Sequence, residues 1–278
     1  MLSKTSYREE FDFSKIEGKP CIPDEERLAQ IEANLATNHR RLTYRTVEHI
    51  APFREKPMIG KVRTMVGHYV VWGIPAPHER TASLYCYGPS LKDTVSDIHG
   101  PGEVRFGDVV TVSGAHDFLV ERGIVPEYHI ECDPRRHKGM MLTPNDETKY
   151  LMASCVHPDV IRKVGNPILW NIADVPGGGS VGLRAIPLLY CLGYRKFVVH
   201  GMDLSFRDGE FHAGKHTGDV PIQVIEVECK GRLFKTSLPL MRYMDCFQKY
   251  VQPHIGDSPA KIQIELRGDG LLKHWVGL

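Results

Sequence analysis

The chain has 278 residues, of which 42% are hydrophobic, 25% charged and 9% aromatic. These proportions are typical of a soluble globular protein and argue against long disorder, collagen-like architecture and coiled coils. The 35 basic and 34 acidic residues leave a net charge of +1, which favours neither nucleic acid nor an anionic membrane as a partner. No apolar run approaches the roughly 20 residues that span a bilayer, and the first residues are too polar for a secretory signal. We therefore expect a soluble, cytoplasmic protein.

The seven cysteines are scattered along the chain and form no CxxC pair. Such spacing suits neither a disulfide framework nor a zinc site. Cys86, Cys132, Cys155 and Cys191 fall in apolar runs, where a free thiol behaves as a small hydrophobic side chain. This cysteine usage favours a reducing compartment.

The first 80 residues differ in pattern from the rest. Leu28, Ile31 and Leu35 recur at helical spacing, which predicts an amphipathic helix with Asp24 as its N-cap. An irregular, proline-punctuated stretch follows it. We interpret residues 1–80 as a helical and irregular arm, which either packs on the main domain or forms a homo-oligomer contact.

From residue 81 onward, short apolar segments alternate with helical patterns. The predicted strands are Ala82–Tyr87, Asp108–Val112, Tyr128–Cys132, Tyr150–Cys155, Pro167–Ile172 and Lys196–His200. Such alternation predicts a mostly parallel sheet that is covered on both faces. Closer to the C-terminus, Ile225–Cys229 and Leu233–Thr236 flank a short turn and predict a hairpin, and a helix and a strand follow. The expected fold class is α/β and doubly wound, in a domain of residues 81–278.

Ligands of open parallel sheets bind beyond the carboxyl ends of the strands. Small residues and carboxylates follow most of the predicted strands: Gly88-Pro89-Ser90, Gly114-Ala115-His116-Asp117, Asp133-Pro134-Arg135-Arg136, Pro176-Gly177-Gly178-Gly179-Ser180 and Gly201-Met202-Asp203. Small residues let a ligand approach backbone N–H groups, and carboxylates can hold a metal or a proton. Together these turns favour a ligand site at this edge of the sheet.

The run from Gly177 to Gly182 has the form GxGxxG, and Asp203 follows it by 21 residues. Glycines of this kind admit a phosphate to the N-terminus of a helix. A dinucleotide site is one interpretation. Several strands precede the run, however, and Pro187 lies in the predicted helix, so we favour another phosphate ligand. Glycines that only shape a turn are the third alternative.

Asp133 and Asp203 each follow a strand and are the carboxylates we expect to hold Mg²⁺; the alternative is that they cap turns. The loop residue His212 is a predicted general acid/base or phosphate contact, or else an ordinary solvated side chain. Glycines around His212 and His216 argue against a zinc pair. Arg135 begins a basic run that can clamp a phosphate or carboxylate, unless these charges are merely solvated.

The order of these motifs resembles the MptE-like family, named for an archaeal 6-hydroxymethyl-7,8-dihydropterin pyrophosphokinase. That family is related to the flagellin glycosyltransferases called motility-associated factors and, more distantly, to bacterial sialyltransferases. The resemblance covers about residues 80 to 278 and rests on Gly88–Leu91, His116–Leu119, Gly123–Tyr128, Asp133-Pro134, Gly178–Val181 and Gly201–Phe206. It implies a Rossmann-like transferase domain that binds a nucleotide-linked phosphate donor.

The resemblance also implies roles for individual residues. Contacts to donor phosphates or ribose are expected from Gly88, Pro89, Ser90, Gly178, Gly179 and Ser180. Asp133 and Asp203 would take the metal or the acceptor hydroxyl. His212, in Asp-Gly-Glu-Phe-His-Ala, resembles a His-Ala of the flagellin enzymes and would transfer a proton. Many relatives have small residues where this chain has His116 and Asp117, so we place both, with Arg135, in an altered acceptor pocket.

Three functions follow as hypotheses. In the first, which we prefer because the compact chain lacks the extra regions of the flagellin enzymes, Mg²⁺ and ATP supply a pyrophosphoryl group to a hydroxymethylpterin-like hydroxyl. In the second, a CMP- or UDP-linked sugar is the donor, and His212 or an aspartate deprotonates the acceptor. The third is a non-catalytic nucleotide-binding protein whose arm recruits a partner.

Overall fold

The computed structural model of the protein describes residues 25–39, 43–44, 63–66, 69–72, 77–95, 107–165, 167–170, 172, 175–214 and 223–277. Asp24, the predicted helix cap, and His216 lie outside these ranges. Within them, no helix combines the length and the apolar composition needed to cross a bilayer, and no disulfide is formed.

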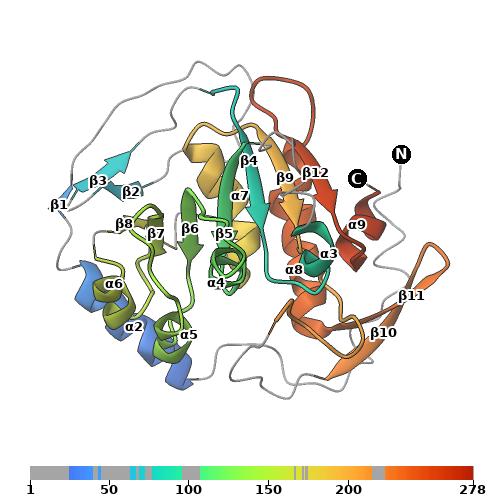
Figure 1. Ribbon diagram of the computed structural model, residues 1–278, viewed down its shortest axis with the longest axis horizontal. Coiled ribbons are helices and arrows are strands. Elements are labelled where there is room, and N and C mark those ends of the chain that lie inside the picture. The colour runs from blue at the N-terminus through green and yellow to red at the C-terminus, as the bar shows by residue number, and fades with distance from the viewer. Residues whose placement is uncertain are drawn as a thin grey trace.

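A ten-stranded sheet forms the centre of the molecule (Figure 1). Seven of its strands run parallel, in the order β8-β7-β6-β5-β4-β9-β12. They are β4 (Thr81–Tyr85), β5 (Asp108–Val112), β6 (Tyr128–Glu131), β7 (Lys149–Ala153), β8 (Ile168–Trp170), β9 (Lys196–His200) and β12 (Gln263–Arg267). The remaining three are β1 (Thr43–Tyr44), β2 (Arg63–Val66) and β3 (Tyr69–Trp72), and β2 pairs antiparallel with β8. The α/β, doubly wound fold class is confirmed.

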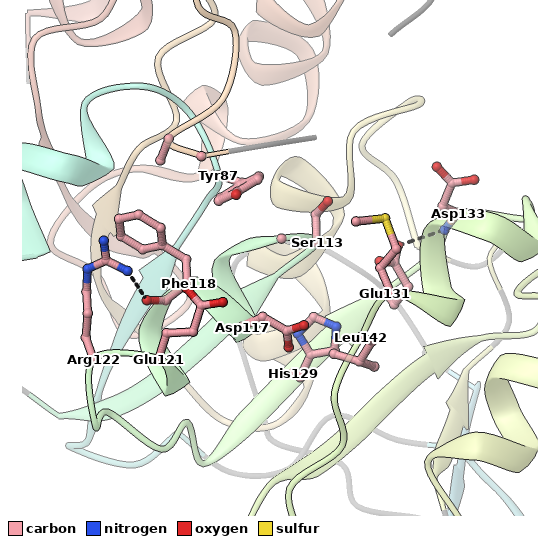
Figure 2. A pocket seen from close by; sticks show the side chains of 14 residues that line it. Tyr87, Ser113, Asp117, Phe118, Glu121, Arg122, His129, Glu131, Asp133 and Leu142 are labelled. Carbon is pink, nitrogen blue, oxygen red and sulfur yellow. Dashed lines mark hydrogen bonds between the residues drawn. The ribbon is translucent and has the colours of Figure 1, made fainter. Parts of the chain in front are cut away.

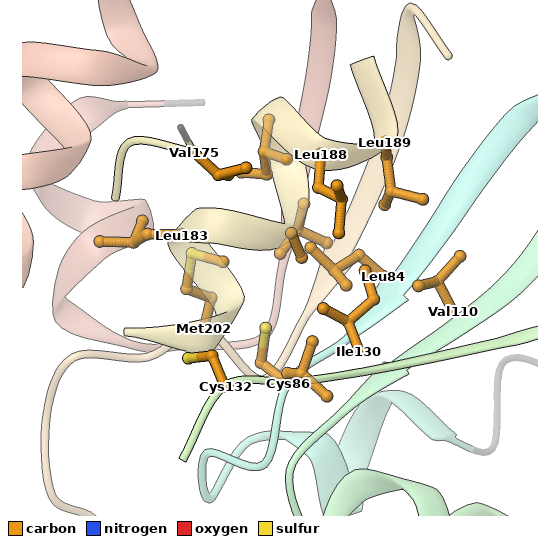
Figure 3. Packing of buried hydrophobic residues seen from close by; sticks show 14 of the residues in the cluster. Leu84, Cys86, Val110, Ile130, Cys132, Val175, Leu183, Leu188, Leu189 and Met202 are labelled. Carbon is orange, nitrogen blue, oxygen red and sulfur yellow. The ribbon is translucent and has the colours of Figure 1, made fainter. Parts of the chain in front are cut away.

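Helices cover the sheet because its strands are apolar on both faces. On one face, Leu84, Val110 and Ile130 belong to a buried cluster with Leu183 and Leu188 of α7 (Val181–Cys191) (Figure 3). On the other face, their strand neighbours Tyr85 and Val109 pack with α3 (Leu91–Thr94) and α4 (Ala115–Val120). Alternate side chains of one strand point to opposite faces, so each strand contributes to both layers.

Strand order reverses between β4 and β9. The chain adds β5 to β8 on one side of β4 and then returns to place β9 on the other side. At the carboxyl ends of these two strands, Gly88 N donates to Gly201 O at 2.9 Å. Such a reversal is the point at which open α/β sheets bind their ligands.

The C-terminal part adds the predicted hairpin, formed by β10 (Val224–Cys229) and β11 (Arg232–Ser237). Lys230 and Gly231 connect the strands with φ of 51° and 77°. Two successive positive φ angles are typical of the two-residue turns that match strand twist. The helices α8 (Leu238–Tyr250) and α9 (Leu271–Val276) and the short η4 (Gln252–His254) complete this part.

The described helix of the N-terminal segment, α2 (Glu25–His39), contacts α6 (Pro158–Lys163). Two buried asparagines attach it to the sheet. Asn34 Nδ2 donates to Pro134 O and Cys155 O at 3.0 and 2.9 Å, and Asn38 Nδ2 donates to Ser154 O and Val156 O at 2.7 and 3.0 Å. All these carbonyls lie just beyond β6 and β7, so α2 covers the carboxyl edge of the sheet there.

Candidate functional site

A cavity of about 410 Å³ lies at the carboxyl ends of β4, β5 and β6 (Figure 2). Tyr87 follows β4, and Ser113 follows β5 with a strained φ of 52°. The strand β6 contributes His129 and Glu131, and the segment after β9 contributes Ala213-Gly214. The cavity therefore lies beside the reversal of strand order, and a non-glycine residue with positive φ is a frequent feature of binding sites.

Glu131 ends β6 with its carboxyl group directed into this cavity. Its Oε1 accepts from the backbone N–H of Cys132 at 2.7 Å and from that of Asp133 at 2.9 Å, the second of which Figure 2 shows. Within the described residues, Oε2 has no hydrogen-bond partner. Burial, followed by the charge of Asp133, raises the pKa of Glu131 to about 7. A carboxyl group with a pKa near neutral can both accept and return a proton at physiological pH.

His129 lies two residues before Glu131 on the same face of β6 and also lines the cavity. Its Nδ1 lies 3.1 Å from Thr111 Oγ1 on the neighbouring strand. Burial, and after it the charge of His116, keeps the pKa of His129 well below the usual histidine value. The imidazole is therefore neutral at pH 7.

The predicted acceptor-pocket residues His116 and Asp117 lie at this cavity in different positions. Asp117 lines it, whereas His116 is fully buried behind it. His116 Nδ1 lies 2.7 Å from Asp117 Oδ1, and its Nε2 lies 3.2 Å from Tyr150 OH. Burial raises the pKa of Asp117, but hydrogen bonds from His116 and Thr143 outweigh it and hold that pKa below its usual value. Asp117 is thus a fixed negative charge on the cavity wall.

The predicted residues Asp133 and Arg135 form a bidentate ion pair at the rim of the cavity. Arg135 Nε donates to Asp133 Oδ1 at 2.9 Å, and Nη2 donates to Oδ2 at 2.5 Å. This side-chain hydrogen bond raises the pKa of Arg135. Asp133 lines the cavity, whereas Arg135 binds Asp133 and is not itself part of the lining.

The predicted residues Gly88, Pro89, Ser90 and Asp203 form a clamp at the reversal of strand order. Ser90 N and Ser90 Oγ donate to Asp203 Oδ2 and Oδ1 at 2.8 and 2.5 Å. Asp203 is only 5% exposed, and burial raises its pKa despite the hydrogen bonds from Ser90. A side chain at Gly88 would collide with Gly201 O and Asp203. The donors of this loop are therefore engaged within the protein.

The glycine-rich loop of Gly178, Gly179 and Ser180 begins α7. Ser180 Oγ caps the helix by accepting from Leu183 N at 3.4 Å, and Arg184 Nε donates to Gly178 O at 2.6 Å. A Cβ on Gly178 would lie 2.6 Å from Cys246 Sγ of α8, so packing against α8 requires this glycine. A Cβ on Gly182 would lie 2.8 Å from Cys86 Sγ, which shows that the amino end of α7 lies against the end of β4. That helix end is suited to an anion.

The residues predicted to hold Mg²⁺ do not fit a protein-held ion as they stand. Both carboxylate oxygens of Asp203 accept from Ser90, and both of Asp133 accept from Arg135. In the part of the chain that the structure describes, no group of three or more histidine, cysteine or acidic side chains could hold a metal. We derive no step through a protein-bound metal.

His212 lies beside the cavity and not in its lining. Its ring stacks on Tyr87 with centroids 5.3 Å apart, and the next residue, Ala213, donates from its N–H to Tyr87 O at 3.0 Å. Tyr87 forms part of the cavity wall. The position of His212 therefore supports the wall of the site.

Glu131 and His129 are the site residues that our sequence analysis missed. Both belong to a segment that we interpreted only as an apolar strand. A usable signal was present: two ionisable residues, His129 and Glu131, alternate with Tyr128 and Ile130 in a strand that the fold class buries on both faces. Ionisable side chains on one face of a buried strand need partners or a cavity.

Comparison with known proteins identifies two similarities. Residues 74–209 match a family model described as 6-hydroxymethylpterin diphosphokinase MptE-like, which confirms the resemblance carried by the motifs. No curated protein matches the chain. Among solved structures, the chain is similar to a MAf glycosyltransferase from Magnetospirillum magneticum AMB-1, with a TM-score of 0.58 and 12% identity. The alignment covers 87% of this chain and 38% of that protein, so the chain spans well under half of its length, and the likeness concerns the fold.

Proposed function

Residues 74–209 belong to the MptE-like family, and on this premise we propose that the chain is a nucleotide-dependent transferase. The proposed reaction is the transfer of a pyrophosphoryl group from ATP to a hydroxymethylpterin-like hydroxyl substrate, with release of AMP. The observation that carries the proposal is the carboxyl group of Glu131, whose pKa is about 7 and which faces a cavity at the ligand-binding edge of the sheet.

In the proposed mechanism, the hydroxyl substrate lies in the cavity with its O–H directed at Glu131 Oε2. The ionised carboxylate takes the hydroxyl proton while the oxygen attacks the β-phosphorus of ATP. The bond from that phosphorus to the oxygen bridging it to the α-phosphorus breaks, and its electron pair leaves with AMP. A positioned base whose pKa lies near the working pH contributes about 10²- to 10⁴-fold to such a rate.

We propose that the donor phosphates bind at the amino end of α7, at Gly178, Gly179 and Ser180. Unpaired N–H groups and the helix dipole favour negative charge at such an end. Mg²⁺ bound to the phosphates of ATP would neutralise part of their charge. Gly88-Pro89-Ser90 and Asp203 would shape the loop beside the donor through the hydrogen bonds that they already make to one another.

Transfer of a sugar from a CMP- or UDP-linked donor is the second proposal. It is supported by the similarity of the fold to a MAf glycosyltransferase. The same cavity would hold the hydroxyl substrate, and Glu131 would again take its proton, but the bond broken would join the sugar to the nucleotide. The third proposal is a nucleotide-binding interaction protein without turnover.

A thermal-shift panel with ATP, CMP, UDP, GDP and NAD, each with and without Mg²⁺, separates the two transferase proposals by their nucleotide donor. A ligand at about 100 times its Kd stabilises the native state by about 2.7 kcal/mol. We expect stabilisation by ATP that depends on Mg²⁺. Stabilisation by CMP or UDP instead would favour sugar transfer, and no shift with any nucleotide would overturn all three proposals.

The role of Glu131 is tested by Glu131→Gln in an assay of AMP release from ATP, Mg²⁺ and 6-hydroxymethyl-7,8-dihydropterin. Glutamine has nearly the same shape but cannot take the proton, so we expect kcat to fall at least about a hundredfold. The matched control is Glu228→Gln, which makes the same chemical change at an exposed position of β10. Wild-type turnover by the Glu131 variant would exclude this carboxyl group as the base.

A further inference from the structure

His129 is the second ionisable side chain that β6 directs into the cavity, and the proposed reaction leaves it without a role. Only 1% of the residue is exposed, and it lines the cavity. Its Nδ1 contacts Thr111 Oγ1 at 3.1 Å. Nε2 has no hydrogen-bond partner among the residues that the structure describes, so this nitrogen is the one left for a ligand.

The surroundings of Thr111 favour one tautomer of His129. The Thr111 hydroxyl also lies 3.4 Å from the carbonyl oxygen of Tyr128, which can only accept a hydrogen bond. A hydroxyl has a single proton. When it donates that proton to Tyr128 O, its oxygen is left to accept from His129 Nδ1–H. Nε2 then carries a lone pair and no proton.

The ring is also fixed in place. His116 packs edge-on against it with centroids 4.9 Å apart, and Tyr150 contacts it with centroids 5.9 Å apart. His116 is itself held at both nitrogens, by Asp117 and by Tyr150 OH. The ionisable groups around the imidazole are thus His116, Asp117, Tyr150 and Glu131. None of them, as placed, donates a hydrogen bond to Nε2.

We propose that His129 Nε2 is a fixed hydrogen-bond acceptor that selects the hydroxyl substrate. This inference rests on the proposed function, which makes this cavity the substrate site. Together with Glu131 Oε2, it would accept from two N–H or O–H groups on one edge of the ligand. A ligand that presents an acceptor atom at this point would leave the buried Nε2 unpaired, and sites of this kind discriminate strongly against such ligands.

The tautomer can be measured without any turnover. Two-bond ¹H–¹⁵N correlation spectra of the full chain with ¹⁵N-labelled histidine distinguish protonated from unprotonated ring nitrogens, and His129→Gln assigns the signal by its loss. We expect a neutral ring with the proton on Nδ1, which stays neutral through about pH 6.5, where an ordinary histidine titrates. A proton on Nε2, or a charged ring at pH 7, would overturn the inference.

Substitution of Thr111 tests the role in substrate selection. Thr111→Val keeps the volume but removes the oxygen that holds Nδ1–H, whereas Thr111→Ser keeps the oxygen. We expect the valine variant to lose the single Nδ1–H tautomer and to raise KM for 6-hydroxymethyl-7,8-dihydropterin about three- to tenfold with a smaller change in kcat. The serine variant should match the wild type in both measurements. Equal KM values in all three proteins would overturn the proposed selection.

The two proposals fail in distinguishable ways. Absence of turnover with every donor, alongside a stable Nδ1–H tautomer, would overturn the proposed function and leave the geometry of His129 intact. Turnover with an Nε2–H tautomer would support the function and overturn the inference about His129.

Discussion

Glu131 and Asp133 are two residues apart, yet their carboxyl groups differ in surroundings and in chemistry. Glu131 is buried and accepts only from backbone N–H groups, so burial dominates and its pKa rises to about 7. Asp133 is partly exposed, and the guanidinium of Arg135 binds both of its oxygens. A neighbouring cation stabilises a carboxylate, whereas burial without one favours the protonated form. Glu131 is therefore placed to exchange a proton at neutral pH.

The raised pKa of Glu131 predicts how stability depends on pH. The pKa of Glu131 is about 7 in the folded state against 4.5 for a glutamate in the unfolded chain, so the folded state binds the proton more tightly. The resulting stabilisation is complete below pH 4.5 and is lost as the pH rises through 7. The shift corresponds to on the order of 3 kcal/mol.

Urea denaturation at about pH 5 and about pH 8 measures this loss. We expect the free energy of unfolding of the wild type, relative to that of Glu131→Gln, to be lower at about pH 8 than at about pH 5. Glu228→Gln should track the wild type at both. A wild-type advantage that is the same at both pH values would contradict the raised pKa.

At the scale of elements, α2 is attached through two asparagines one helical turn apart. Asn34 and Asn38 lie four residues apart and so share one face of the helix. Each is only 2% exposed and donates to two backbone carbonyls. These bonds supply donors to backbone carbonyl groups just after β6 and β7, next to the segment that carries Glu131 and Asp133.

Asn38→Ala should therefore release α2 from the sheet edge. The substitution leaves Ser154 O and Val156 O without their side-chain donor, at a cost of about 1–3 kcal/mol. We expect faster hydrogen exchange of the α2 amides, with exchange in β4 and β9 unchanged. Thr37→Ala is the control, because the Thr37 side chain is exposed and bonds only within the helix. Equal exchange in both variants would show that the asparagine bonds do not hold the helix.

At the scale of the whole molecule, the clamp joins the ends of two strands that are distant in sequence. Ser90 follows β4, and Asp203 follows β9, 113 residues later. The segment after β12 closes over both: a side chain at Gly268 would collide with Ser90, and one at Gly270 would collide with Asp203. Two buried hydrogen bonds thus hold the centre of the sheet together where its strand order reverses.

Asp203→Asn should weaken the whole fold. One oxygen becomes an NH₂ group that faces either the N–H or the O–H of Ser90, and a buried donor without an acceptor costs about 1–3 kcal/mol. The expected result is a lower midpoint of urea denaturation for the whole domain. Asp208→Asn is the matched control, since the Asp208 side chain is 93% exposed. Unchanged stability with loss of nucleotide binding would instead make Asp203 a ligand contact.

Most of the fold could be predicted from the sequence, because buried parallel strands are continuous apolar segments between turn residues. The predicted strands at Asp108–Val112 and Lys196–His200 coincide with β5 and β9. The strands β1 to β3 were not predicted as part of the sheet, although they extend it beyond β8. These strands are short and lie in a proline-rich segment, and β2 pairs antiparallel with both β3 and β8, so they lack the crossover pattern that marks the others.

The site was less accessible to sequence analysis, for a physical reason. Proximity to a strand end identified Asp203, but not that Ser90 occupies both of its oxygens from a distant part of the chain. Likewise, the pattern of β6 does not reveal which of its faces borders a cavity. Whether an ionisable residue is a ligand contact or a structural partner depends on groups that only tertiary packing brings together.

The attachment of α2 depends on side chains of the helix but only on the main chain of the loops that it contacts. The two partners are therefore constrained differently when their sequences change. Backbone carbonyls are present whatever the residue, so positions 134 and 154–156 can change their side chains without withdrawing a partner from the helix. Only the two asparagines on the helix cannot be exchanged freely. A helix that carries an Asn pair at this spacing is therefore a portable module, which can be grafted onto a relative whose loops follow the same path.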